Sequence, residues 1–186
     1  FRAWIVAFLV FAAIVSSVDV SRAEIGTYVA IYSVVGMATS ILGAQVALYT
    51  NRSHTITIIM AISFLLGTTL GFLLGMPFLI VVAAAGVYSG LIMTDSASLT
   101  AGIVATAQER LRGATLAMQQ VTGFSGGALG TVVVGWVLDL SGGQQSHLAW
   151  ILACLTIATG SLVGIIGLRI MMGLASASTN NSVSAE

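Results

Sequence analysis

Residues 53–94 contain no Asp, Glu, Lys or Arg, so no fixed charge interrupts this long apolar stretch. A membrane-spanning helix needs about 20 apolar residues, and the stretch is too long for one such helix. Pro77 lies inside it, and proline removes a backbone donor and keeps the preceding residue out of the helical region. We therefore expect two consecutive spans, 55–74 and 78–104, that meet at Gly75-Met76-Pro77.

The composition of the whole chain indicates the same class of protein. Charged residues make up 6% of the chain, against roughly 25% in soluble domains, and the mean hydropathy is +1.06. A water-soluble domain could not cover its surface with so few charges, so we expect an all-α membrane protein. Because the chain starts with Phe1-Arg2 inside an apolar segment, the first of six spans is expected to be N-terminally truncated. The predicted segments are spans 2–18, 25–49, 55–74, 78–104, 113–139 and 148–169, bundle domain 1–172 and disordered cytoplasmic tail 173–186.

The arginines predict the orientation of the bundle, because cytoplasmic loops carry an excess of Lys and Arg. With six spans, alternate connections lie on the same side of the membrane. One side then carries four arginines, and the other carries Arg22, which Asp19 and Glu24 offset. We expect a multi-pass protein of the plasma (inner) membrane with a cytoplasmic C-terminus. The four arginines of the cytoplasmic side are Arg52, Arg110, Arg112 and Arg169.

A possible serine nucleophile lies in the fifth span. Residues 122–130 read TGFSGGALG and contain the G-x-S-x-G pattern of serine hydrolases, which requires a strand-to-helix turn and a nearby histidine. No strand pattern surrounds Ser125, which excludes such a turn. An intramembrane serine protease is disfavoured because Ser125 lies roughly 21 Å below the outer surface, whereas His147 and His54 lie at opposite surfaces. We expect no enzyme activity.

The glycines of this segment suggest helix packing instead. Gly123, Gly126 and Gly130 fall within about 40° of Gln119 on a helical wheel, whereas Ser125 lies about 120° away. Small residues at this spacing let helices approach closely in lipid, so we expect a helix-packing seam. The second span has a similar row of small residues. That row is Ser33, Gly36, Ser40, Gly43 and Ala44.

One cysteine and two histidines cannot form a disulfide or a metal-binding set. We therefore expect no metal and no cofactor, and we interpret Cys154 as a packing residue. The zero net charge gives no sign of a nucleic-acid partner.

Two charged residues are candidates for a solute or ion pathway, because charges inside a membrane are costly and usually functional. Asp95 could bind a coupling proton or a cationic group, or could be a carboxylate that bonds to neighbouring hydroxyls. Arg2 could bind an anionic substrate through its planar fork, or could extend to the membrane surface. Gln119 and Gln120 are further candidates, since amides in lipid need either a cavity or a partner helix to face.

The segment 108–139 resembles a known family. It reads QERLRGATLAMQQVTGFSGGALGTVVVGWVLD, which is similar to a loop and the eleventh helix of a major facilitator superfamily transporter. In that family an ERRG turn precedes a glycine-rich helix. Residues 88–97, YSGLIMTDSA, resemble the tenth helix, and residues 43–52 lie where the loop between the eighth and ninth helices is found. The chain as a whole resembles the C-terminal six-helix half of a twelve-helix transporter.

This resemblance implies a 3+3 inverted repeat and alternating access of a small solute to a site between two halves. The implied partners are a missing N-terminal six-helix half of the same chain, the lipid bilayer and a small-molecule substrate. In the family's loop an acidic residue and arginines latch the cytoplasmic side, but here Ala47 stands at the acidic position and cannot make that charged contact. Thr50 stands at the position of the loop's second glycine. In the eleventh helix Thr131 replaces the usual proline, so a kink is not implied there. The residues implied for gating are Gly43, Arg52, Arg110, Arg112 and Gly113.

A second hypothesis remains beside the transporter. The chain could be a self-contained six-helix membrane protein with a structural or assembly role. A second six-helix half upstream of Phe1 would favour the transporter, and a start codon just before Phe1 would favour the alternative.

Overall fold

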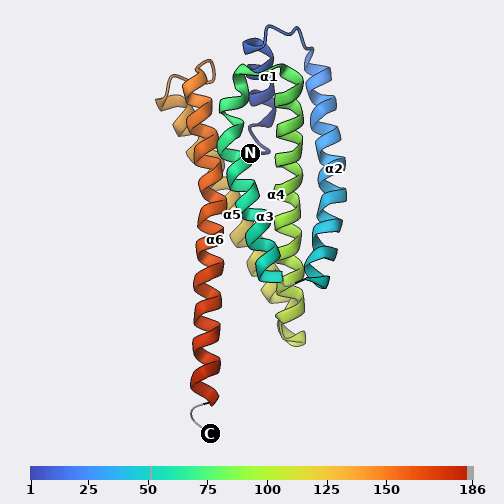
Figure 1. Ribbon diagram of the computed structural model, residues 1–186, viewed down its shortest axis with the longest axis vertical. Helices are drawn as coiled ribbons and strands as arrows, with labels where there is room; N and C mark the ends of the chain where they lie inside the picture. The colour runs from blue at the N-terminus through green and yellow to red at the C-terminus, as the bar shows by residue number, and fades with distance from the viewer. Residues whose placement is uncertain (51, 184–186) are drawn as a thin grey trace.

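The computed structural model describes residues 1–50 and 52–183, and all regular secondary structure in these residues is helical. The helices run alternately up and down, so that connections 16–21, 71–77 and 141–146 lie at one end of the molecule and 107–111 at the other (Figure 1). The long helices are α1 (Ile5–Val15), α2 (Arg22–Tyr49), α3 (Arg52–Leu70), α4 (Phe78–Thr106), α5 (Arg112–Leu140) and α6 (His147–Val183). Two short 3₁₀ helices, η1 (Phe72–Gly75) and η2 (Glu109–Leu111), precede α4 and α5.

The helices α2 to α6 are long and apolar enough to cross a membrane, whereas α1 is a shorter apolar helix. This confirms the expected all-α class and fits a multi-pass helical membrane bundle. The break predicted at proline is also present: α3 ends at Leu70, η1 follows, and α4 begins at Phe78 with Pro77 as its N-cap residue.

The bounds of the first and last helices differ from the predicted segments. The first helix covers residues 5–15 and not 2–18, because Ser17 adopts a left-handed φ of 55° and closes a Schellman motif. In this motif the Val18 amide donates to the Ala13 carbonyl at 3.0 Å, and the Ser17 amide donates to the Ile14 carbonyl at 3.1 Å. Helix α6 extends to Val183 and so enters the segment 173–186 that was expected to be a disordered tail. No proline occurs there to stop the helix, and residues 184–186 lie outside the described part of the chain.

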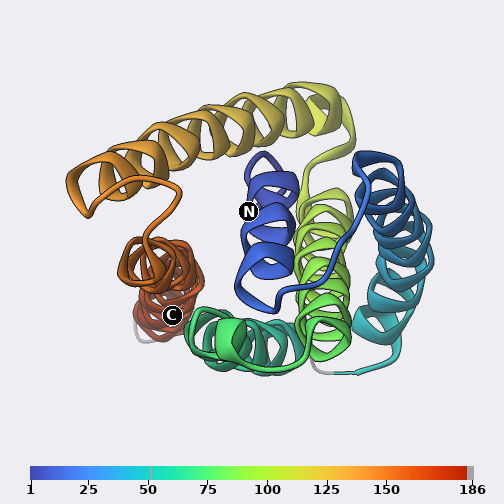
Figure 2. The same ribbon diagram turned by 90° about the horizontal axis from the view of Figure 1, so that it is seen from above.

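The apolar core lies at the end of the bundle that contains α1. Seen from above, α1 lies inside a ring formed by α3, α4, α5 and α6, and α2 packs outside against α4 (Figure 2). Trp150 at the start of α6 is 1% exposed and contacts the rings of Phe8 at 5.6 Å and Phe11 at 6.2 Å between centroids. Cys154 is buried in the same cluster, as expected for a packing residue.

Helices α2 and α4 form the most closely packed pair. A Cβ added to Gly43 would lie 3.0 Å from the carbonyl oxygen and 3.1 Å from the Cα of Thr94, so the two backbones are in direct contact. The hydroxyl of Ser98 donates to the Gly43 carbonyl at 3.1 Å, and the hydroxyl of Thr39 donates to the Gly90 carbonyl at 3.1 Å. The row of small residues on the second span therefore allows close helix packing, as its spacing predicted.

Candidate binding groove

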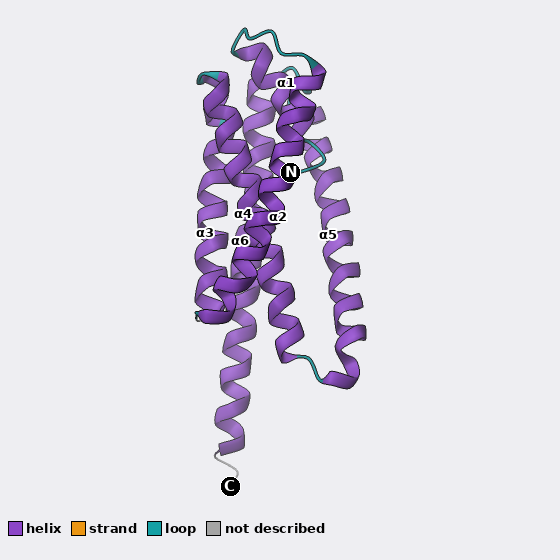
Figure 3. Ribbon diagram, turned by 90° about the vertical axis from the view of Figure 1, so that its right-hand side faces the viewer, coloured by secondary structure: helices purple, strands orange, loops and turns teal. Residues whose placement is uncertain are grey.

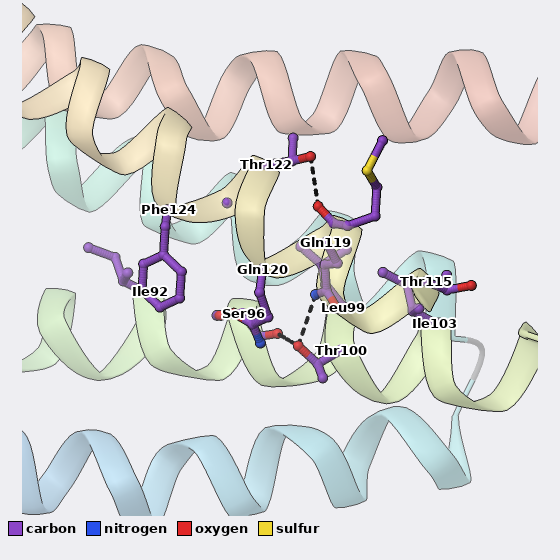
Figure 4. Close-up of a pocket in the computed structure, with 12 residues that line it drawn as sticks. Ile92, Ser96, Leu99, Thr100, Ile103, Thr115, Gln119, Gln120, Thr122 and Phe124 are labelled. Atoms are coloured by element: carbon purple, nitrogen blue, oxygen red, sulfur yellow. Dashed lines mark hydrogen bonds between the residues drawn. The ribbon is translucent and has the colours of Figure 1, made fainter. Parts of the chain in front are cut away.

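An open groove lies between α4 and α5. The two helices meet at the 107–111 connection, and α5 then leans away from α4 toward the opposite end of the bundle (Figure 3). The groove has a volume of about 720 Å³. Its lining residues come from both helices and are Ile92, Ser96, Leu99, Thr100, Ile103, Thr115, Met118, Gln119, Gln120, Thr122, Gly123 and Phe124 (Figure 4).

The polar centre of the groove is a hydrogen-bonded pair from the two helices. The Nε2 atom of Gln119 donates to the hydroxyl oxygen of Thr100 at 2.9 Å, and Thr100 in turn donates its only hydroxyl hydrogen to the Ser96 carbonyl at 3.0 Å (Figure 4). Thr100 therefore has only lone pairs left for Gln119, so the amide nitrogen must face it. This orientation leaves the Oε1 atom of Gln119 buried, with no hydrogen-bond partner among the described residues.

Two other hydroxyls of the groove also donate hydrogen bonds to backbone carbonyls of their own helix. Thr115 donates to the Leu111 carbonyl at 3.0 Å, and Thr122 donates to the Met118 carbonyl at 2.8 Å. Their oxygens keep free lone pairs, since a hydroxyl is one donor and two acceptors. These threonines therefore present hydrogen-bond acceptors to the groove.

A second hollow of about 650 Å³ lies between α2 and α4 and shares Ser96 and Thr100 with the groove. Met93 contributes to its lining, and its sulfur lies 3.6 Å from the Nη1 atom of Arg2. The two hollows thus adjoin along one face of α4. Arg2 itself is exposed and lies against α4 beside this second hollow.

The candidate pathway residues are only partly brought together. Gln119 and Gln120 both line the groove, and Gln120 is exposed in it. Arg2 reaches α4 but is not part of the groove lining. Asp95 lies in α4 directly before Ser96, and its side chain falls outside the described residues.

The five gating candidates do not form one loop motif. Gly43 lies inside α2, packed against Thr94, and the helix continues to Tyr49, where the predicted span 25–49 also ends. Arg110 and Arg112 are exposed at the 107–111 end of the bundle, and Gly113 borders open space. The side chain of Arg52 lies outside the described residues.

The predicted glycine seam on α5 has no neighbour within the described part of the chain. A Cβ added at Gly123, Gly126 or Gly130 would meet nothing within 4 Å, and residues 121–130 are all exposed. No helix of the described chain covers these glycines, so the expected packing against another helix stays a prediction. Helical spacing predicted correctly which residues share a face, but it does not say what covers the face. Helix α5 instead buries Val134 and Leu138 at its other end, near α6.

Ser125 lies in the middle of the continuous helix α5 and is exposed. A nucleophile elbow needs a sharp strand-to-helix turn, so the G-x-S-x-G pattern does not form one here. Cys, His, Asp and Glu side chains of the described residues form no group of three that could hold a metal ion.

The threonines that share the groove with Gln119 were not predicted from the sequence. Thr115 and Thr122 lie four residues before and three residues after it, so helical periodicity could have placed them on its face. Thr100 could not be found this way, because its contact with Gln119 depends on how α4 and α5 pack. Comparison of the chain with protein-family models, curated proteins and solved structures found no significant match.

Proposed function

We propose that this chain is one half of a secondary transporter of the major facilitator type, and that the groove between α4 and α5 is one wall of its solute pathway. The protein would move a small solute by alternating access between two six-helix halves. The observation that carries the proposal is a groove with glutamine and hydroxyl side chains along two helices that are otherwise apolar enough to span a membrane.

Polar side chains facing hydrocarbon are costly, because lipid cannot satisfy their hydrogen bonds. The groove presents two glutamine amides and several hydroxyls on α4 and α5. The face beside it on α5 is exposed over residues 121–130 and carries Gly123, Gly126 and Gly130. A face of this kind fits a water-filled cavity next to a second set of helices better than it fits lipid.

A contact between the first and fifth helices supports the inverted repeat. If α1, α2 and α3 repeat as α4, α5 and α6, the close pair α2 and α4 has its counterpart in α5 and α1. The indole nitrogen of Trp4, just before α1, donates to the Thr131 carbonyl of α5 at 3.1 Å. A Cβ added to Gly135 would lie 3.3 Å from the Trp4 ring. These two contacts join the counterpart helices, which pack far less closely than α2 and α4.

The arginines support a cytoplasmic position for the 107–111 end of the bundle. Arg110 and Arg112 are exposed there, at the same end as the C-terminal part of α6 (Figure 1). An excess of arginine marks the cytoplasmic side of bacterial inner and eukaryotic plasma membranes alike. We infer that this end faces the cytoplasm.

Cysteine accessibility tests the proposal in the protein that contains this chain. Cys154 is buried, so we expect it not to react with the probe when cysteines are introduced at Ser96 and Thr122. Any cysteines elsewhere in the protein are removed. Val163 on α6 is 68% exposed and is not part of the groove, which makes Val163→Cys the lipid-facing control. We expect a membrane-impermeant maleimide to label Ser96→Cys and Thr122→Cys, and to leave Val163→Cys unlabelled.

A transport measurement completes the test. Labelling of Thr122→Cys should also stop solute counterflow in proteoliposomes, because the adduct blocks the pathway. If another segment of a longer protein fills the groove, both groove cysteines will stay as unreactive as Val163→Cys, and the proposal fails.

The exposed glycine face supports the alternative of a structural or assembly protein. Small residues favour close approach of another helix, and within the described chain no helix covers them. In that case a partner helix protects the groove cysteines from the maleimide, and no solute is moved.

A further inference from the structure

We propose that the groove selects an uncharged solute that donates hydrogen bonds and has an apolar face. This inference rests on the proposed transport function and names the class of substrate for the same groove. Three properties of the lining carry it: its charge, its hydrogen-bonding groups and its apolar walls.

The first property is charge. None of the described residues that line the groove is Asp, Glu, Lys, Arg or His. A charged solute that leaves water for such a site loses hydration that no counter-charge replaces, which is strongly unfavourable. A neutral solute avoids this cost. Asp95 is adjacent to Ser96 in sequence, so a cationic probe must be part of the test.

The second property is the surplus of acceptors at the centre of the groove. Thr100, Thr115 and Thr122 have each given their hydroxyl hydrogen to a backbone carbonyl, so only lone pairs remain. The Oε1 atom of Gln119 is a further acceptor and is buried without a partner. An unsatisfied buried acceptor is costly, and this cost is relieved when a donor reaches it. Ser96 and Gln120 are exposed, so water can satisfy them when the groove is empty.

In the present state Oε1 is covered, so a solute reaches it through a rotation of the Gln119 side chain. Gln119 is held by one hydrogen bond, from its Nε2 atom to Thr100. The rotation weakens or breaks the hydrogen bond between Gln119 and Thr100. A new hydrogen bond from a hydroxyl or amide N–H of the solute to Oε1 offsets this loss of free energy. At the Thr100 hydroxyl itself only a donor of the solute can bind, because its hydrogen is already given to the Ser96 carbonyl.

The third property is the apolar wall. The apolar lining residues are Ile92, Leu99 and Ile103 on α4 and Met118 and Phe124 on α5. The ring of Phe124 lies beside Ile92 (Figure 4). Phe124 is 76% exposed, so its ring is free to contact a solute. A ring or hydrocarbon face stacks here while hydroxyl or amide groups reach Gln119. The volume of about 720 Å³ suits a drug-sized molecule, since ligand pockets measure roughly 300–1,000 Å³.

The test measures binding to the whole protein in lipid nanodiscs by equilibrium dialysis. The neutral probes are phenyl β-glucoside and N-acetyltyrosinamide, which combine an aromatic face with hydroxyl or amide donors. Phenyl glucuronide and tyrosinamide are the anionic and cationic counterparts. The tetra-O-methyl ether of phenyl β-glucoside keeps the ring and removes every donor. We expect at least one neutral probe to bind, and its charged counterpart and the ether to bind at least about fivefold more weakly, the ether through lost hydrogen bonds.

Two variants connect this selectivity to the groove. Gln119→Met keeps the length of the side chain and removes Oε1, so the neutral probe should bind about fivefold more weakly. Gln45→Met is the matched control, because Gln45 is exposed on α2 and is not part of the groove lining. Failure of both neutral probes to bind, equal binding of the ether or of a charged counterpart, or unchanged binding by Gln119→Met would each overturn the inference. Labelled groove cysteines together with a preference for a charged probe would refute the substrate class alone, whereas unlabelled groove cysteines would refute the transporter proposal.

Discussion

Gln119 on α5 and Thr100 on α4 are joined by a hydrogen bond of 2.9 Å in which the glutamine amide is the donor. Because Thr100 gives its own hydrogen to the Ser96 carbonyl, the pair can form in one orientation only. The same orientation leaves Gln119 Oε1 unpaired. One bond thus connects the two walls of the groove and determines which atom of the Gln119 amide is left without a partner among the described residues.

This geometry predicts an unequal response to removing either partner. Thr100→Val leaves both polar ends of the Gln119 amide without a partner, and we expect it to lower stability by about 1–2 kcal/mol. Gln119→Leu removes the unpaired oxygen together with the bond, so it should cost less than Thr100→Val. Thermal unfolding in nanodiscs measures both. Thr159→Val is the control, because the Thr159 hydroxyl on α6 bonds only within its own helix, to the Thr156 carbonyl. An equal or larger loss for Gln119→Leu would contradict the assigned orientation.

Two glycine substitutions should have opposite effects. Gly43→Ala puts a methyl group against the Thr94 backbone, which cannot move aside, and overpacking of this kind costs about 1–3 kcal/mol. Gly126→Ala meets no atom within 4 Å and gains helix propensity, up to about 1 kcal/mol. Unfolding midpoints of the isolated chain 1–186 and of the protein that contains it provide the measurement.

The second of these variants also shows whether anything covers α5. If another segment of a longer protein packs on the glycine face, Gly126→Ala will destabilise that protein while leaving the isolated chain unchanged or more stable. Equal effects in both would show that the face stays open in the complete protein.

The third prediction concerns the core around Trp150. Trp150→Ala removes the ring that contacts Phe8 and Phe11 and should cost about 3–5 kcal/mol. Trp150→Phe keeps an aromatic ring but loses the 2.9 Å bond from the indole nitrogen to the Gln144 carbonyl, so about 1 kcal/mol is expected. Chemical unfolding of the three proteins gives the order. A loss for Trp150→Phe as large as that for Trp150→Ala would show that the hydrogen bond matters more than the ring packing.

The fourth prediction concerns the start of α2. Ser21 and Glu24 form a capping box in which the Ser21 amide donates to Glu24 Oε2 at 2.7 Å and the Glu24 amide donates to the Ser21 hydroxyl at 3.2 Å. Ser21→Ala should cost about 1 kcal/mol and Ser21→Gly only a few tenths. Hydrogen exchange of the first-turn amide of Ile25 is the local readout. Exchange that is unchanged in Ser21→Ala would show that the cap does not hold this turn.

Much of the helical architecture could be predicted from local features. The charge-free stretch and Pro77 predicted two helices with a break between them, and α4 does begin at Phe78. The small residues around Gly43 predicted close packing, which α4 provides. Gln119 and Gln120 were predicted to face a cavity or another helix, and Gln119 does both, because a polar group in a membrane helix must find a partner. Each of these inferences needed only the chemistry of one segment.

The end of α1 at Val15 and the extension of α6 to Val183 were not predicted. Ser17 adopts a left-handed conformation that glycine usually provides, so composition gave no signal for a Schellman motif. The polar residues after Gly173 resemble a disordered tail, yet none of them is a helix-breaking proline. Local composition is a weak guide at helix ends, where single backbone conformations decide.

The sequence by itself determined the class of the protein, since so few charges leave a membrane bundle as the workable fold, and helical spacing determined which residues share a face of each helix. Only the tertiary structure decided which faces are covered. The glycine rows on α2 and α5 look alike in sequence, but the first packs against α4 and the second borders open space. The hydrogen bond between Gln119 and Thr100 likewise depends on how α5 is placed relative to α4. The physical reason is that periodicity is a property of one helix, whereas a contact or a groove requires the position of two.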